Sequence, residues 1–348
     1  MKILQILLPS GLGGVERIAS QLLISNQKDE CYLGIDKNYY NDFISYFYPE
    51  NKNIILLDCS SIISSLYSVK KCITTVKPDI VHTHARREMI FVCLCKNKFV
   101  HIRTQHMEEK PRIPVTIFEK ILLSKKVDRW IATSKKLAKL YLESKNYIDS
   151  KKISIVYNGT HKGRKRNSFE VKRKYCIICR LTKQKGIDIL IKEIAEMDEK
   201  IKRQRSIDIW GEGEELKAIF DLVKKLKVNN IFKYKGKTSC PAEVVVNYDA
   251  LLMPSRNEGL PLTMLESMST GTPVAIHDVG CISEFIISQK NGWIINAAFT
   301  WKDFFDEILE FQEYENICKN AEKTFDELFS LEIMQKNYFE IYRMEVKN

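Results

Sequence analysis

Short apolar runs recur along this chain, and amphipathic stretches separate them. In the first half the runs cover residues 2–8, 31–36, 53–58, 78–84, 99–106 and 129–134. The apolar residues in each run are nearly continuous instead of alternating with polar ones. That pattern is typical of strands that are covered by helices on both faces. It predicts an α/β fold with a doubly wound parallel sheet.

The same alternation begins again in the second half of the chain. Further apolar runs cover residues 176–180, 206–211, 231–236, 250–255, 273–278 and 293–296. A chain of 348 residues also exceeds the usual size of one compact domain. We therefore predict two Rossmann-like domains, 1–160 and 175–325, that face each other across a cleft. Ligands of such sheets bind beside the carboxyl ends of the strands.

The remaining segments are expected to connect or cover these domains. Residues 161–174 contain seven Lys/Arg and few apolar residues, so we predict an interdomain linker there. Residues 326–348 have a helical period with aromatic anchors such as Phe339 and Tyr342. We predict a C-terminal helix that packs back on the N-terminal domain.

Positive charge is unevenly distributed. The formal net charge is +11, and residues 96–152 contain fifteen Lys/Arg against six Asp/Glu. Such a patch suits an anionic partner, although lysines on solvated helices would give the same composition. Residues 110–139 mix apolar and basic side chains, which fits either docking on an anionic membrane surface or a core-facing amphipathic helix. No aromatic–basic motif accompanies the lysines, so nucleic acid is not an expected partner.

Neither the cysteines nor the apolar runs indicate secretion. The ten cysteines form no regular framework, and Glu16 and Arg17 soon follow the short first apolar run. No run approaches the roughly 18 apolar residues that span a membrane. We expect a cytoplasmic protein, and residues 110–139 leave open a peripheral position on the inner face of the cytoplasmic membrane.

Two glycine-bearing turns follow predicted strands, and the first can bind an anion. Gly13 and Gly14 stand between the first strand and the first helix, where backbone N–H groups and the helix dipole favour negative charge. This turn lacks the Gly-Lys-Ser/Thr of a P-loop and the third glycine of a dinucleotide fingerprint. A tight strand–helix turn is the alternative for this segment. Gly211 lies in another glycine-bearing turn at the end of a strand, which either admits a nucleotide base or ribose or caps the following helix with acids.

Two cations flank the turn at the start of the second domain. Arg180 ends a predicted strand, and Lys185 precedes Gly186 at a helix entrance. Cations that converge on such a junction suit a diphosphate. Two solvated surface charges are the alternative.

The segment RNEGLPLTMLES, residues 256–267, places two carboxylates around the start of an apolar helix. Pro261 fits the first turn of a helix after Gly259–Leu260, so Glu258 stays in the loop and Glu266 lies inside the helix. The backbone amides at this helix start would be donors at the positive end of the helix dipole. A phosphate can therefore bind there, with one carboxylate on each side.

These motifs together resemble glycosyltransferase family 4, whose members are retaining enzymes of the GT-B fold. The segment PSRNEGLPLTMLESMSTGTPV is similar to the family hallmark, in which two glutamates stand eight positions apart before a Gly-x-Pro-Val strand. The resemblance continues through GLGGVERIA, PDIVHTH, SIVYNG, CRLTKQKG, IWGEGEEL and NGWII, over nearly the whole chain. The chain departs from the family at NGTH, where an aspartate commonly follows NG-x.

The resemblance implies a role for each charged residue of the predicted donor site. Arg180 and Lys185 match the pair that binds the donor diphosphate. Glu266 matches the glutamate that holds the ribose hydroxyls, and Glu258 matches the one beside the donor sugar, where it supports positive charge at the anomeric carbon. The other donor-binding positions are Gly13, Gly14, Gly211, Gly259, Leu260 and Pro261.

One histidine completes the implied site. His106 occupies the place of a histidine that is often found near the donor sugar, and His82 and His84 compete for that place. A buried histidine at a strand end is the alternative for all three.

The resemblance also implies the reaction. The protein would move a sugar from a nucleotide-diphosphate donor, most commonly a UDP-sugar, to a saccharide or lipid-linked saccharide in cell-surface polysaccharide synthesis (lipopolysaccharide, capsule or O-antigen). The chain has no Asp-x-Asp motif. We therefore expect metal-independent transfer without a cofactor, in which cations and helix amides stabilise the departing phosphate.

Two other functions compete with this prediction. A glycoside hydrolase would use Glu258 and Glu266 as an acid/base pair, but hydrolysis gives no reason for Arg180 and Lys185. A non-catalytic module would bind an anionic surface through the basic patch.

Overall fold

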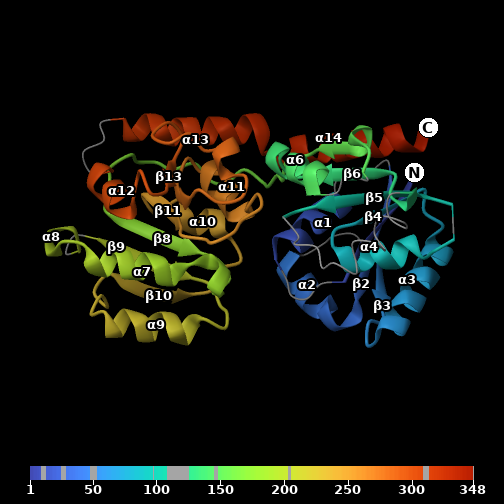
Figure 1. Ribbon diagram of the computed structural model, residues 1–348, viewed down its shortest axis with the longest axis horizontal. Helices are drawn as coiled ribbons and strands as arrows, with labels where there is room; N and C mark the ends of the chain where they lie inside the picture. The colour runs from blue at the N-terminus through green and yellow to red at the C-terminus, as the bar shows by residue number, and fades with distance from the viewer. Residues whose placement is uncertain are drawn as a thin grey trace. The chain divides into compact units, whose positions relative to one another are not determined.

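The computed structural model describes residues 1–8, 13–24, 29–47, 53–96, 98–107, 125–144, 148–202, 205–308 and 313–347. The chain divides into two compact units, which Figure 1 shows. Unit 1 contains Met1–Asn158 and Leu331–Asn348, and unit 2 contains Gly159–Ser330. Each unit has one parallel sheet covered by helices, which confirms the predicted fold class.

Unit 1 is built on a seven-stranded sheet in the order β3-β2-β1-β4-β5-β6-β7. All neighbouring strands in it run parallel. The strands are β1 (Lys2–Leu7), β2 (Glu30–Asp36), β3 (Ile54–Leu57), β4 (Ile80–Thr83), β5 (Val100–Gln105), β6 (Arg129–Ala132) and β7 (Ile153–Ile155). The helices described in this unit are α1 (Gly14–Ile24), α2 (Tyr40–Phe47), α3 (Ile62–Val76), α4 (Arg86–Cys93), α6 (Lys135–Ser144) and α14 (Leu331–Lys347).

Unit 2 is built on a six-stranded parallel sheet in the order β10-β9-β8-β11-β12-β13. Its strands are β8 (Lys174–Ile178), β9 (Ser206–Trp210), β10 (Phe232–Gly236), β11 (Ala250–Met253), β12 (Val274–His277) and β13 (Trp293–Ile295). Its α-helices are α7 (Ile187–Glu196), α8 (Glu199–Lys202), α9 (Leu216–Lys225), α10 (Pro241–Val245), α11 (Leu262–Ser269), α12 (Trp301–Glu307) and α13 (Tyr314–Leu328).

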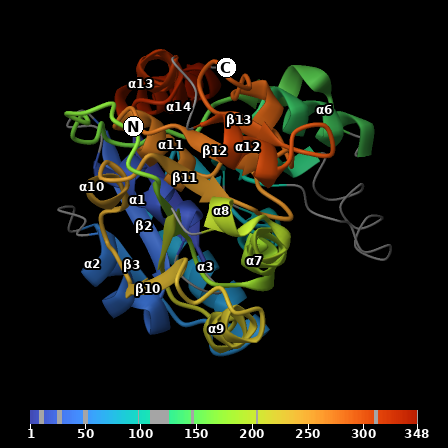
Figure 2. The same ribbon diagram turned by 90° about the vertical axis from the view of Figure 1, so that its left-hand side faces the viewer.

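The strands of unit 2 are apolar because helices cover both faces of the sheet. Ile207, Ile209 and Leu252 are fully buried and belong to one core with Trp293 and Phe304. Figure 2 shows α12, which brings Phe304, beside β13. Each fully buried aliphatic side chain of this kind contributes roughly 1.5–3 kcal/mol to folding.

Both sheets reverse their strand order once. In unit 1, β1 lies between β2 and β4, and in unit 2, β8 lies between β9 and β11. The chain leaves the two central strands toward opposite sides at such a reversal, so ligands bind there beside the carboxyl ends. The fold therefore singles out the loops after β1 and β4 in unit 1, and those after β8 and β11 in unit 2.

The segment predicted as a linker, 161–174, lies within unit 2 in the structure. Arg166 is buried, and its guanidinium donates a hydrogen bond to the Tyr314 hydroxyl at 2.7 Å. Gly163 N–H donates to Ser269 Oγ at 3.0 Å. A basic composition suggested an exposed connection, but this arginine covers an aromatic ring and fixes the segment on its own unit.

The C-terminal segment 326–348 is divided between the units. Residues up to Ser330 belong to unit 2, and α14 belongs to unit 1. On α14 the Tyr342 hydroxyl lies 2.7 Å from His82 Nδ1, and Glu345 forms an ion pair with Arg129. The C-terminal helix therefore packs on the N-terminal unit through buried polar contacts as well as aromatic ones.

Candidate functional site

The loops after β8 and β11 bring a lysine and a glutamate together in unit 2. Lys185 Nζ lies 2.7 Å from Glu258 Oε1. Ser255 Oγ donates a second hydrogen bond to the same oxygen at 2.6 Å. Because the Glu258 side chain is only 6% exposed, these two donors replace the water that would otherwise solvate its charge. The structure thus joins two predicted residues and adds Ser255, which sequence reasoning missed.

Two glycines allow these loops to approach each other. Gly186 has φ 63°, and a Cβ atom there would lie 2.0 Å from the Pro254 carbonyl oxygen. Gly280 has φ 58°, and its Cβ atom would lie 1.9 Å from the Glu258 carbonyl oxygen. Only glycine adopts this left-handed conformation without cost and without a clash at such short range. The backbone on both sides of Glu258 is therefore fixed by close packing.

Further polar contacts hold the two loops in register. Arg256 forms a bidentate ion pair with Asp188, at 2.8 and 2.7 Å. Gln184 Nε2 donates to the Asn257 carbonyl at 2.9 Å. Hydrogen bonding to Arg256 lowers the pKa of Asp188. Sequence reasoning missed this pair because its members are far apart in the chain.

The start of α11 provides backbone donors close to Glu258 in the chain. Pro261 is the residue before the helix, in extended conformation, and not part of its first turn as predicted. Among the described residues, the N–H groups of Leu262 and Thr263 donate no hydrogen bond. Two such amides at the positive end of a helix can bind an anion.

The other predicted donor residues of unit 2 lie in the loops and the helix that follow strands of its sheet. Glu266 lies inside α11 and is only 2% exposed. Arg180 follows β8, and its side chain is exposed. Gly211 follows β9 with φ 131°, and a Cβ atom there would lie 1.8 Å from the Cys179 carbonyl oxygen. Gly211 therefore lets the turn after β9 pass against the turn that carries Arg180.

The loop residues Gly259 and Leu260 lie between Glu258 and α11, where Cys281 Sγ contacts the Gly259 carbonyl.

The glycine turn of unit 1 is described only in part. Gly13 and Gly14 are exposed at the start of α1, where Arg17 N–H donates to the Gly13 carbonyl at 3.2 Å. Residues 9–12, which complete the predicted loop, lie outside the described residues.

The three histidines proposed for unit 1 have different environments. His82 is completely buried between Thr104 Oγ1 and the Tyr342 hydroxyl, at 2.7 Å from each. His84 is 3% exposed, whereas His106 is partly exposed. Burial lowers the pKa of His106 to about 3, and it lowers the pKa of His82 and His84 as well. These imidazoles are therefore neutral at physiological pH, and among the three residues His106 is the most exposed.

Potential metal ligands do not gather within the part of the chain that the structure describes. No group of three or more His, Cys, Asp or Glu side chains lies there in an arrangement that could hold an ion.

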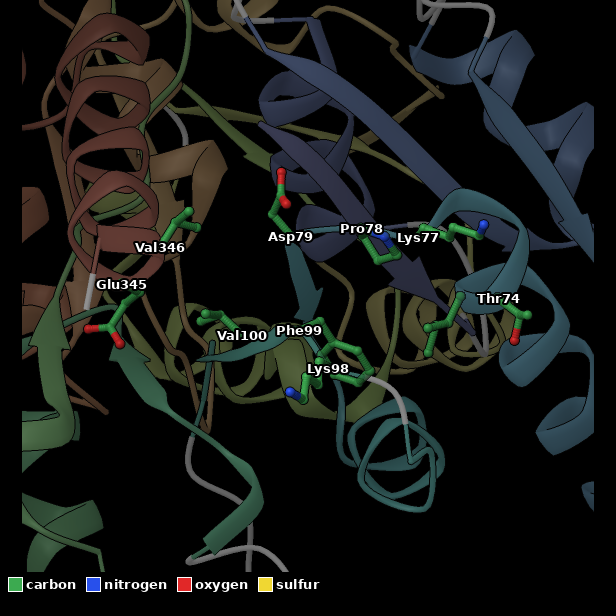
Figure 3. A pocket seen from close by; sticks show the side chains of 10 residues that line it. Thr74, Lys77, Pro78, Asp79, Lys98, Phe99, Val100, Glu345 and Val346 are labelled. Carbon is green, nitrogen blue, oxygen red and sulfur yellow. The ribbon is translucent and has the colours of Figure 1, made fainter.

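A large cavity in unit 1 lies away from these residues. It has a volume of about 830 Å³ and precedes β4 and β5, at the amino ends of the strands (Figure 3). Its lining includes Lys77, Asp79, Lys98 and Glu345. The ammonium groups of Lys77 and Lys98 point away from each other, so they do not converge on one ligand.

The predicted membrane segment, 110–139, is described only from residue 125 onward. Its described part contains β6 and the beginning of α6. Of the helices that could be examined in the described ranges, none combines the length and the apolar character that a membrane span requires.

Two family models match this chain. The model described as Glycosyltransferase Family 4 matches residues 37–164, and the model described as Glycosyl transferases group 1 matches residues 160–325. The second model covers the loops that carry Lys185 and Glu258.

Individual proteins are also similar to this chain in sequence or in structure. An uncharacterized 41.2 kDa protein in the cps region of Klebsiella pneumoniae is 27% identical over 82% of this chain and 83% of its own length. An uncharacterized glycosyltransferase of Methanocaldococcus jannaschii is 27% identical over 95% of this chain and 96% of its own. The crystal structure of Anabaena Alr3699/HepE in complex with UDP and glucose has a TM-score of 0.84 at 15% identity, over 99% of this chain and 100% of that one. This last similarity is one of fold.

Proposed function

The chain belongs to the GT-B glycosyltransferases, and we propose that it transfers a sugar from a UDP-sugar to a saccharide or lipid-linked saccharide with retention of anomeric configuration. The acceptor belongs to the synthesis of a cell-surface polysaccharide: lipopolysaccharide, capsule or O-antigen. The reaction requires neither a metal nor a cofactor.

The pairing of Lys185 with Glu258 carries this proposal. The two groups lie 2.7 Å apart where the strand order of unit 2 reverses, which is where such sheets bind nucleotides. The next helix begins with the amides of Leu262 and Thr263, which donate no hydrogen bond to any residue that the structure describes. A cation, a buried carboxylate and helix amides at one edge suit a ligand that combines phosphate with a sugar.

Each group has a place in the transfer step. Arg180 and Lys185 bind the diphosphate and offset the negative charge that develops on it as the glycosidic bond breaks. Glu258 lies beside the sugar and stabilises the positive charge at the anomeric carbon. Glu266 accepts hydrogen bonds from the ribose hydroxyls. The departing phosphate takes the proton of the acceptor hydroxyl on the same face of the sugar, which retains the configuration.

Metal independence is supported by the residues that the chain offers for leaving-group stabilisation. The whole sequence lacks Asp-x-Asp, the motif with which many sugar transferases recruit a divalent ion. Cations and helix amides supply the same electrostatic stabilisation without one.

The nucleotide and the location of the protein are further parts of the proposal. UDP is favoured because it is the ligand named for the Anabaena protein that shares this fold. The protein is cytoplasmic and docks peripherally on anionic lipid through residues 110–139, whose basic and apolar side chains suit that surface.

A donor panel tests the proposal. UDP- and GDP-sugars are incubated with the protein in EDTA, and release of the nucleoside diphosphate is monitored in the presence of saccharide acceptors. We expect turnover of at least one UDP-sugar, and NMR of the product should show the anomeric configuration of the donor. Release of free sugar without nucleotide dependence, or an absolute requirement for a divalent ion, would contradict it.

A further inference from the structure

A line of hydrogen bonds crosses the carboxyl edge of the unit 1 sheet and ends at His106. Gln5 Nε2, on β1, donates to the Ala19 carbonyl of α1 at 3.0 Å. Gln5 Oε1 lies 2.9 Å from His84 Nε2, just after β4. His84 Nδ1 lies 3.2 Å from His106 Nε2, just after β5. The three strands are neighbours in the order β1-β4-β5, which is why these side chains meet.

The direction of each hydrogen bond follows from the first one. Because the Gln5 amide nitrogen faces the Ala19 carbonyl, the oxygen of that amide faces His84 and can only accept. His84 therefore carries its proton on Nε2. In a neutral imidazole the other nitrogen is an acceptor, so His84 Nδ1 accepts from His106 Nε2–H.

Because a neutral imidazole has one protonated nitrogen, the same reasoning determines which ring nitrogen of His106 has no proton. With its proton on Nε2, the ring has a lone pair on Nδ1, and no hydrogen bond joins Nδ1 to another of the described residues. Burial favours the neutral form of both rings, because it lowers the pKa of His84 and that of His106. The inner members of the line are inaccessible, with Gln5 1% and His84 3% exposed, whereas the residue His106 is partly exposed.

We propose that Gln5 and His84 are positioning residues that hold His106 in the Nε2-protonated tautomer, so that His106 Nδ1 accepts a hydrogen bond from a sugar hydroxyl. The identity of the ligand rests on the proposed function, but the tautomer does not. In this state His106 does not act as a general acid toward the leaving group, because its only ring proton is donated to His84. Its contribution is to select and orient a sugar that presents a hydroxyl at this position.

The tautomers can be measured directly. In protein labelled with ¹⁵N-histidine, long-range ¹H–¹⁵N spectra distinguish the protonated from the unprotonated nitrogen of each of the six rings. Assignment uses single His→Gln variants. We expect Nε2–H at both His84 and His106 in the full-length protein. Protonation of Nδ1 in either ring would overturn the proposal, whether or not a sugar substrate has been identified.

A variant links the tautomer to the substrate. Gln5→Met has a similar volume but no acceptor for His84 Nε2–H, so both rings should become tautomeric mixtures. The KM for the sugar substrate should rise roughly five- to tenfold while kcat changes less. UDP affinity, measured by calorimetry, should stay within twofold, because the proposed UDP site lies in unit 2.

The outcomes separate the two proposals. Unchanged tautomers and unchanged KM in Gln5→Met would overturn the positioning role. Normal tautomers in a protein that turns over no nucleotide sugar would support the positioning of His106 and contradict the proposed function instead.

Discussion

Lys185 Nζ lies 2.7 Å from Glu258 Oε1, so a cation from the loop after β8 meets an anion from the loop after β11. An ammonium group has three N–H donors, and one of them serves Glu258. The others can bind a donor phosphate, which places the carboxylate and the phosphate on the same ammonium. In the proposed reaction, this pair sets the distance between the diphosphate leaving group and Glu258, the residue proposed to lie beside the sugar.

The charge of Glu258 is expected to matter for turnover and not for nucleotide binding. Glu258→Gln keeps the shape of the side chain but removes the negative charge, so turnover should fall by about 10²-fold or more. UDP affinity should be equal or slightly higher, because Lys185 no longer shares its charge with a carboxylate. Calorimetry with UDP and a coupled assay for UDP release measure both effects. The control is Glu315→Gln, which changes an exposed ion pair on α13. Equal turnover in Glu258→Gln and Glu315→Gln would refute the role of Glu258.

Glu266 is expected to act on the ribose. Because this side chain is buried in α11, Glu266→Gln should weaken UDP binding by roughly ten- to a hundredfold through the loss of charge-assisted hydrogen bonds. The wild-type protein should prefer UDP to 2′-deoxy-UDP, and the variant should lose much of that preference. Thermal unfolding shows whether the fold is intact. An undiminished preference in a folded variant would contradict the assignment.

Gly280 is expected to be required for the conformation of Glu258. In Gly280→Ala the new Cβ atom would lie 1.9 Å from the Glu258 carbonyl oxygen, so the loop must move and turnover should be lost. Gly236 is a matched control, because it also has positive φ but no atom of the described residues lies within 4 Å of its Cβ position. Gly236→Ala should cost about 1 kcal/mol of stability and leave turnover intact. If both variants turn over normally, the loop after β11 does not depend on this packing.

The lowered pKa values of four histidines in unit 1 predict a stability that decreases in acid. Burial lowers the pKa of His82, His84, His101 and His106, and the value for His101 and His106 is about 3. The unfolded chain, with pKa values of about 6.5, therefore binds more protons than the folded one below that pH. The stabilisation is complete above about pH 6.5 and is lost as the pH falls toward 3. Each fully buried histidine contributes at most about 1.4 kcal/mol per pH unit in this window.

Denaturant unfolding between about pH 7.5 and 5 measures this slope. His82→Gln should reduce the slope, and His161→Gln, at an exposed position, should not. A slope that is the same in wild type and His82→Gln would show that His82 is not neutral in the folded protein.

The sequence was sufficient to predict the sheets, because continuous apolar runs report burial on both faces. The run at 78–84 contains β4, and the run at 250–255 contains β11. Composition failed at residues 161–174, since a basic segment can be fixed by one buried cation such as Arg166 over Tyr314. Lysines and arginines are exposed on average, but a single one such as Arg166 can be buried.

Local motifs were sufficient to predict single residues of the site but not the contacts between them. Glu258 and Lys185 were identified one at a time, but their contact joins residues of two loops and depends on strand order. Gln5 shows the same limit. It lies within an apolar run, and it meets His84 because β1 pairs with β4 in a register that sets Gln5 opposite His82. The register between the two strands cannot be read from the apolar run or from the histidine motif alone.

The most direct test compares two lysines of the same turn. Lys185→Ala removes the proposed diphosphate ligand, whereas Lys183→Ala removes an exposed side chain two residues earlier. In EDTA with a UDP-sugar, kcat/KM should fall by about 10²–10³ in Lys185→Ala, with weaker UDP binding, and should stay within about twofold in Lys183→Ala. Equal activity and equal UDP affinity in the two variants would contradict the proposal that Lys185, held beside Glu258, binds the donor diphosphate.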